Sequence, residues 1–141
     1  MKTYARTIVA LAGLALIVSA TTLNAQSTDT ITKVPFAFNV GSSLMPRDTY
    51  RVSRIGGHTD VFMISGFKHS AILIGQPDDP KTDDSPRLVF HRYGDSYFLR
   101  EVRLAGSTGF SLPETRLERD AQERIAGRST PEVIVVAANQ K

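Results

Sequence analysis

The chain contains no cysteine. This absence excludes disulfide bonds, thiolate nucleophiles, cysteine-ligated zinc and a lipid anchor on a cysteine side chain. A small domain of this kind therefore depends on its hydrophobic core for stability. Tryptophan is absent too, which excludes any binding platform built on an indole ring.

A strong charge of one sign is also lacking. The formal charge is +3, and it falls to +1 when the two cations at the extreme N-terminus, Lys2 and Arg6, are left out. No cluster of Lys and Arg is interleaved with aromatic residues. The composition therefore gives no indication of a nucleic-acid partner.

Long hydrophobic runs are missing as well. The longest apolar run, residues 8–18, has 11 residues, whereas a transmembrane helix needs about 20. Two basic residues precede the run, and a short segment of small and polar residues, 19–25, follows it. This pattern predicts a signal peptide of residues 1–25, with cleavage after Ala20 as an alternative. A retained N-terminal anchor is the competing interpretation. We expect an exported protein, periplasmic or secreted, with no membrane span after signal removal.

Residues 26–141 alternate short apolar runs with Gly, Pro and Asp, which is typical of a single all-β domain. We expect six to eight strands arranged as an antiparallel barrel or closed sandwich. The expected strands span residues 31–40, 49–55, 61–65, 70–75, 87–93, 96–104 and 132–138. The first has Pro35 inside it, which indicates an edge strand or a strand end there. The last is apolar throughout and is expected to be fully buried.

One helix is expected in the C-terminal region, at about residues 113–126. Ser111 and Glu114 match a capping box, in which each side chain satisfies a free backbone N–H. Apolar residues then recur at helical spacing: Leu117, Ala121 and Ile125.

The segment 87–104 is the clearest hairpin. Its two-residue connection, Gly94-Asp95, has glycine first, as a type II′ turn with positive φ requires. The resulting register pairs Arg92 with Tyr97, His91 with Phe98, Phe90 with Leu99, and Val89 with Arg100. Phe90 and Leu99 are expected to be a buried pair, with Arg92 beside the Tyr97 ring.

No strong catalytic or phosphate-binding motif is present. His58 and Asp60 lie on one side of a strand or turn, and with His69 or His91 they would suit a metal ion if three segments converged. Otherwise these histidines are solvated or packed on neighbours. A second possibility is calcium at the aspartates of loop 76–86, but the usual spacing of a calcium loop is missing. We therefore expect no metal and no cofactor.

Several segments resemble an uncharacterised group of small exported bacterial β-rich proteins, for which no activity is known. The shared segments are V-P-F-x-F-x-V-G, here residues 34–41, and F-H-R-Y-G-D, here residues 90–95. Residues 45–50, 97–102 and 112–119 fit the same pattern, although Arg47-Asp48 replaces a Pro-Ala-Gly-like turn. The resemblance implies export and a β fold, and it supplies no catalytic residue.

The sequence thus favours a non-catalytic exported module with a structural or interaction role in the cell envelope. The first alternative is a carrier of an apolar small molecule in a barrel cavity lined by Phe and Tyr. An enzyme of unknown class ranks third. The weak candidates for a ligand or interaction site are His91, Arg92, Tyr93, Tyr97, His58 and Asp60.

Overall fold

The computed structural model describes residues 29–78, 85–125 and 130–140. The expected signal peptide and residues 79–84 of the aspartate-rich loop lie outside these ranges. No helix in the described part of the chain is long and apolar enough to cross a membrane.

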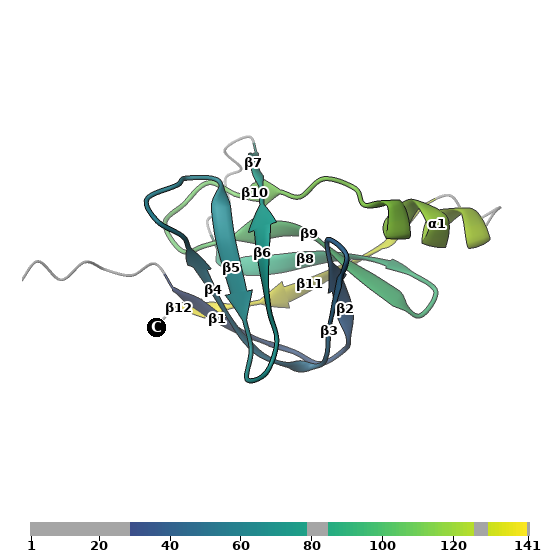
Figure 1. The fold of residues 1–141 in the computed structure, drawn as a ribbon, viewed down its shortest axis with the longest axis horizontal. Coiled ribbons are helices and arrows are strands. Elements are labelled where there is room, and N and C mark those ends of the chain that lie inside the picture. Colours follow the sequence, from purple (N-terminus) through teal and green to yellow (C-terminus); the bar gives the residue numbers. More distant parts are fainter. Residues whose placement is uncertain (1–28, 79–84, 126–129, 141) are drawn as a thin grey trace, which may run out of the picture.

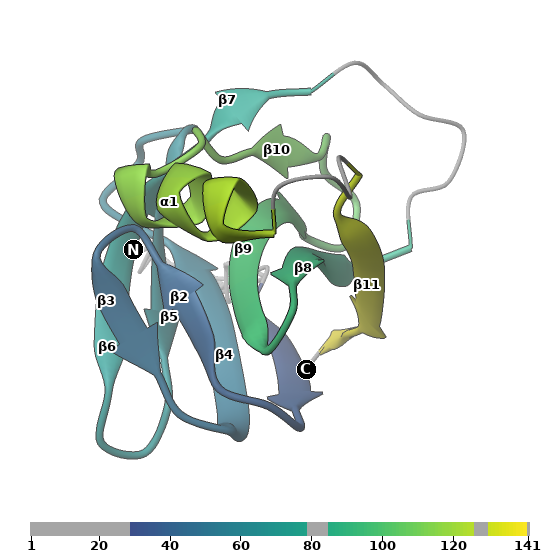
Figure 2. The same cartoon turned by 90° about the vertical axis from the view of Figure 1, so that its right-hand side faces the viewer.

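Two β-sheets face each other and enclose the core between them (Figures 1 and 2). The first has the strand order β12-β1-β4-β5-β6, with β1 (Thr30–Val34), β4 (Asp48–Arg54), β5 (Val61–Ser65), β6 (Ser70–Ile74) and β12 (Asn139–Gln140). The second has the order β11-β8-β9-β10-β7, with β7 (Gln76–Pro77), β8 (Arg87–Tyr93), β9 (Ser96–Arg103), β10 (Phe110–Ser111) and β11 (Glu132–Ala137). The short strands β2 (Phe38–Val40) and β3 (Ser43–Met45) extend it, because β2 pairs with both β3 and β9.

The β-rich sandwich agrees with the expected fold class, although the described strands are more numerous than expected. Five of the twelve, β2, β3, β7, β10 and β12, span only two or three residues. Such pieces are too short to show a periodic pattern in the sequence. Every pairing is antiparallel except the one between β2 and β9.

The expected strand 31–40 is wrong as a single element. It breaks after Val34, so that β1 belongs to the first sheet and β2 to the second. Pro35 has no N–H to donate to a ladder, and the chain changes sheets there. The four apolar residues that alternate along this segment are nevertheless all buried or packed against the core: Val34, Phe36, Phe38 and Val40.

The last strand is also not the fully buried strand expected. β11 lies at the margin of the second sheet, and its Val133 and Val135 side chains are 56% and 57% exposed. Ile134 and Val136 face the core. A uniformly apolar run does not reveal which of its faces is buried.

Aromatic side chains fill the space between the sheets. Phe38, Tyr50, Phe62 and Phe90 are all 0% exposed. The Phe38 ring meets the rings of Tyr50 and Phe90 edge-on, at centroid distances of 5.2 and 5.1 Å. The aromatic residues considered as the lining of a ligand cavity therefore pack on one another as core.

The sheets do not close into a barrel among the described strands. β6 pairs only with β5, and β3 pairs only with β2, so each leaves one edge free. On the opposite side of the molecule the chain itself joins the sheets, passing from β11 in one to β12 in the other.

The hairpin of β8 and β9 confirms most of the expected register. Gly94 has φ of +60°, and the pairs Arg92 with Tyr97, His91 with Phe98 and Phe90 with Leu99 are present. The pair of Val89 with Arg100 is wrong, because Val89 lies opposite Glu101. Arg100 is the additional residue of a β-bulge.

The helix α1 spans Arg116–Arg124 and begins later than the expected 113–126. Ser111 is not its cap, since it lies in β10 and pairs with β9 and β7. The true N-cap is Thr115, whose hydroxyl accepts the Glu118 N–H at 3.1 Å. Leu117 of the expected apolar stripe is 47% exposed, and the buried residues of the helix are Glu118 and Ala121.

Candidate functional site

His58 and Asp60 do not form part of a metal site in the described structure. His58 is exposed beside the Gly56-Gly57 turn, and its N–H donates to the Ile55 carbonyl at 3.1 Å. No group of three His, Cys, Asp or Glu side chains in the described ranges could hold a metal ion. The convergence of segments that this hypothesis required is therefore not observed.

Arg92 and Tyr97 do lie together, on the face of the hairpin that carries Phe90. The Arg92 guanidinium lies 5.4 Å from the centre of the Tyr97 ring, and it forms an ion pair with Glu132 at 3.1 Å. The Tyr97 ring also stacks on the Phe36 ring, at a centroid distance of 4.0 Å. These contacts join β8, β9, β11 and the β1–β2 corner, and thus explain the F-H-R-Y-G-D segment by fold requirements.

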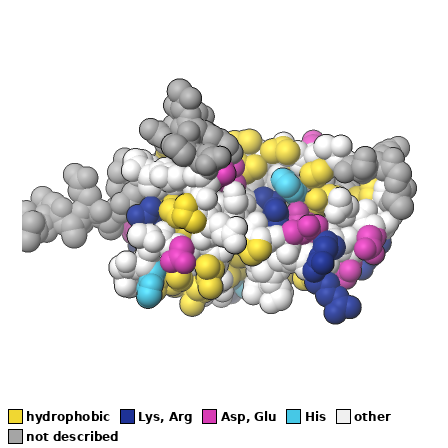
Figure 3. Space-filling view, turned by 90° about the horizontal axis from the view of Figure 1, so that it is seen from above, with side chains coloured by type: hydrophobic (Ala, Val, Ile, Leu, Met, Phe, Trp, Pro, Cys, Tyr) yellow, Lys and Arg dark blue, Asp and Glu magenta, His cyan; other side chains and the backbone are white. Residues whose placement is uncertain are grey.

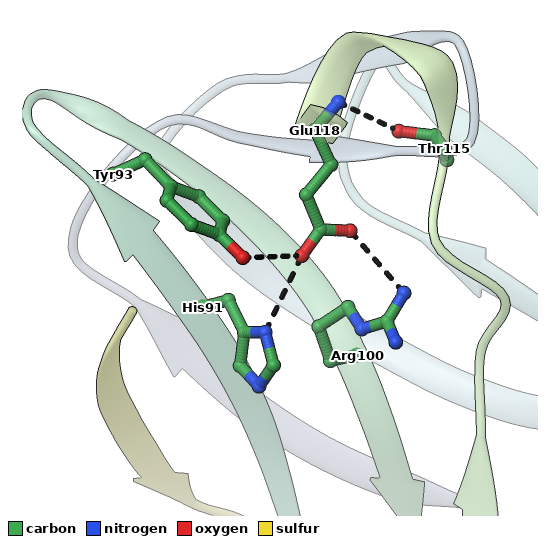
Figure 4. Close-up of polar contacts among 5 residues, drawn as sticks. All are labelled: His91, Tyr93, Arg100, Thr115 and Glu118. Atoms are coloured by element: carbon green, nitrogen blue, oxygen red, sulfur yellow. Dashed lines mark hydrogen bonds and ion pairs between the residues drawn. The ribbon is translucent and has the colours of Figure 1, made fainter. Parts of the chain in front are cut away.

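His91 and Tyr93 project from the opposite face of β8 and meet a carboxylate that the sequence did not single out. Glu118 is 1% exposed, and Figure 4 shows three side chains pointing at it. His91 Nδ1 lies 3.3 Å from its Oε1, and the Tyr93 hydroxyl lies 3.4 Å from the same atom. Arg100 Nη1 contacts Oε2 at 3.2 Å. We call these four residues the Glu118 cluster.

The β-bulge explains how Arg100 reaches the helix. Leu99 and Val102 both belong to the core, although they are three positions apart in the strand. Strict alternation would direct them to opposite faces. The additional residue restores the inward direction of Val102 and leaves Arg100 on the outer face, beneath α1. The sequence did not predict the outward position of Arg100, because a β-bulge interrupts the alternation of a strand and has no periodic pattern that would reveal it.

The Glu118 cluster is a closed ionic clamp. Burial, and next the negative charge of Glu118, raise the pKa of the Tyr93 hydroxyl above its usual value of 10.0. The Glu118 side chain is 2% exposed, and both of its oxygens are contacted by side chains from the sheet. These contacts hold α1 on the second sheet. A reacting molecule would have to displace them in order to reach the carboxylate. The signal in the sequence was the capping pattern Thr115-x-x-Glu118.

An open surface lies beside this clamp, between the two sheets. We call it the edge groove, because the free edge of β6 forms one wall and the β2–β3 hairpin forms the other. Ile72, Leu73 and Ile74 line it from β6, and Asn39, Val40 and Gly41 line it from β2 and its turn. The remaining lining residues lie at the end of the groove near α1: Phe98, Leu99, Leu112, Pro113, Thr115 and Glu118.

Exposed aliphatic side chains accompany the groove. Ile72 and Ile74 are 68% and 63% exposed, and Leu44 of β3 is 64% exposed. On the face seen in Figure 3, hydrophobic side chains form scattered groups, and charged side chains gather at the end that carries α1. The groove therefore combines an apolar lining with free strand edges, a combination that marks interaction sites in soluble proteins.

No protein-family model matches the chain, and no match was found among curated proteins or solved structures.

Proposed function

We propose that this protein is an exported, non-catalytic interaction module that binds its partner in the edge groove. The observation that carries the proposal is the position of an apolar groove between two free strand edges, on β6 and β3. Export rests on the N-terminal pattern of residues 1–25 and on the resemblance to small exported bacterial proteins. A strand bound in the groove would bring the sheets closer to the barrel expected from the sequence.

The packing of the core favours this role over that of a small-molecule carrier. The aromatic side chains that would line a barrel cavity fill the space between the sheets. The two parts of the edge groove have volumes of about 270 and 510 Å³, and both open widely to solvent and enclose little of a bound molecule. Typical small-molecule sites enclose about 300–1,000 Å³ and bury most of the ligand.

The ionisable side chains favour a binding module over an enzyme. The described cluster of ionisable groups around Glu118 is closed by its own contacts. The edge groove contains one ionisable lining residue, Glu118, and that carboxylate already contacts Arg100. Acid–base or nucleophilic catalysis requires a polar group within hydrogen-bond reach of a substrate, and these side chains are occupied.

A matched pair of variants tests the proposal. Ile72→Glu places a charge on the edge groove, whereas Val135→Glu places one on the exposed face of β11, far from the groove lining. The parent and both variants would be purified from the exported fraction of the native organism and examined by native mass spectrometry. We expect a stoichiometric protein partner with the parent and with Val135→Glu, and its loss with Ile72→Glu. Retention of that partner by Ile72→Glu would refute the assignment of the groove.

A further inference from the structure

We propose that the edge groove accepts an extended, uncharged segment of another polypeptide, which pairs with β6 as an added strand. This inference rests on the proposed function and specifies how the partner is recognised. Backbone hydrogen bonds would supply affinity, and alternate side chains of the segment would contact the groove walls.

Two hydrogen bonds that flank β6 determine which of its backbone groups are available. The Gly66 N–H donates to His69 O, and the Gly75 N–H donates to Asp60 O, each at 2.8 Å. Both belong to the register that pairs β5 with β6. Hydrogen-bonded pairs alternate along an antiparallel ladder, so Ala71 and Leu73 bond to β5.

The same alternation directs the N–H and C=O groups of Ser70, Ile72 and Ile74 away from β5. No other described strand pairs with β6 on that side. Three alternate residues of one edge therefore offer the donors and acceptors that an antiparallel or parallel partner needs. β6 also contains no charged residue and no proline, the features that usually block pairing at an edge.

The opposite wall restricts the kind of partner. Val40, Gly41, Ser42 and Ser43 line the groove across from Ser70–Ile72. A second copy of this chain would approach with β5 still attached to its own β6, so the groove, which the β2–β3 hairpin bounds, would have to accommodate a paired strand and its neighbour. A single extended segment has no such neighbour. We therefore assign the groove to a linear segment and not to the edge of another sheet.

The lining specifies the chemistry of that segment. Serine hydroxyls occur at the end near the β5–β6 turn, and aliphatic side chains line the middle. The one ionisable lining residue, Glu118, has Arg100 as its counter-charge, so the groove presents no free charge to a ligand. The five residues of β6 correspond to roughly 17 Å of extended chain at about 3.3 Å per residue. The segment is thus about five residues long, uncharged and apolar at alternate positions.

The probe is a fluorescent heptapeptide, acetylated and amidated, with valine at every second position and serine or threonine between. Its binding to the full exported chain would be measured by fluorescence anisotropy. Two further peptides carry N-methyl groups, one on the odd and one on the even residues, so that each loses the donors of one edge. We expect the parent peptide to bind, and at least one methylated peptide to bind about tenfold or more weakly.

Protein variants provide the matched control. Ile72→Pro removes an N–H that points away from β5, whereas Ile72→Thr keeps this N–H and the β-branched shape but reduces apolar surface. Thermal melts establish that each variant is folded. We expect Ile72→Pro to weaken peptide binding about tenfold and Ile72→Thr by less than about threefold. Amide exchange at Ser70, Ile72 and Ile74 should slow when the peptide is bound.

The outcomes separate this inference from the proposed function. Failure of the peptide to bind, or equal binding of all three peptides, contradicts strand addition. If Ile72→Glu still loses its natural partner in that case, the groove is a binding site that recognises something else. If Ile72→Glu keeps its natural partner, the proposed function itself is wrong.

Discussion

The strands β6 and β11 lie at opposite margins of the sandwich and carry similar exposed aliphatic surface. Ile72 and Ile74 are 68% and 63% exposed on β6, and Val133 and Val135 are 56% and 57% exposed on β11. Hydrophobicity therefore does not distinguish the two strands. They differ in their surroundings.

β11 is held at both ends. Glu132 at its start forms an ion pair with Arg92 at 3.1 Å. At its end the Ala137 carbonyl accepts the Thr32 hydroxyl at 3.0 Å, and the chain continues into β12, which pairs with β1. These contacts connect the two ends of the strand to neighbouring strands of both sheets.

β6 is also linked to the other sheet at its end, because it ends at Ile74 and the chain continues through Gly75 into β7, which pairs with β10. What distinguishes β6 is the open apolar groove that lies along its free edge. An apolar edge without charge or proline is a liability for aggregation, which proteins usually blunt. The open groove beside β6 is therefore consistent with a binding role.

The largest effect on stability should arise away from both edges, in the Glu118 cluster. Glu118→Ala leaves the partly buried Arg100 guanidinium without its counter-charge and removes a partner from Tyr93, at a cost of about 1.5–3 kcal/mol in the free energy of unfolding. Urea denaturation measures it. Glu123→Ala, on the exposed side of the same helix, should change stability by less than about 0.5 kcal/mol. Equal effects of the two variants would show that the clamp does not hold α1.

The next effect concerns the turn that sets the register of β8, the strand on which β11 depends. Gly94 has φ of +60°, a conformation that is strained for a β-branched residue, so Gly94→Val should cost at least about 1 kcal/mol. Thermal melts test this. Asp95→Val, at the second turn position, provides the control for added apolar surface. A Gly94→Val protein as stable as the parent would contradict the turn geometry.

Substitutions on β6 and β11 should be nearly neutral for stability but should differ in their effect on aggregation. Ile72→Lys and Val135→Lys are each expected to change the free energy of unfolding by less than about 0.5 kcal/mol, since both side chains are exposed. Only Ile72→Lys places a charge on the strand edge beside the open groove, so only it should slow aggregation at high concentration. Light scattering during prolonged incubation compares them, and equal rates would remove the distinction between the edges.

The smallest effect is a pH dependence at the turn that precedes β6. Asp48 accepts the N–H groups of Phe67 at 3.0 Å and Thr49 at 2.7 Å, and these bonds, that of Phe67 first, lower the pKa of its carboxyl below 3.8. Because the folded pKa is depressed, the stabilisation is present above the unfolded pKa and is lost as the pH falls through the folded pKa. Asp48→Asn should flatten the stability profile in this acidic range, whereas Asp60→Asn serves as the comparison. An unchanged acid limb in Asp48→Asn would contradict the contribution of these bonds.

The sequence predicted those elements whose pattern is local. Alternation in residues 49–55 and 61–65 and the glycine of the β8–β9 turn led to strands and a register that the structure confirms. Non-local features were missed. The break at Pro35 depends on a second sheet being present, and the position of Arg100 depends on a bulge.

The candidate site was predicted less well than the fold. His91 and Tyr93 are among the predicted candidates, but their partner Glu118 is not, because the predicted helix cap is Ser111, four residues before the true cap Thr115. The edge groove could not be predicted, since its walls are 30 residues apart in the chain and a free edge is defined by the strands that are missing from it. Periodicity identifies a strand but does not identify its neighbours.

Site-specific photocrosslinking in the native organism tests the central claim most directly. A benzophenone side chain would replace Ile72 in the edge groove or Val135 on β11, two positions of similar exposure. The account predicts a discrete adduct with one partner from position 72, mapped by mass spectrometry to an uncharged, alternately apolar segment of that partner, and none from position 135. Adducts with the same partner from both positions, or from position 135 alone, would contradict it.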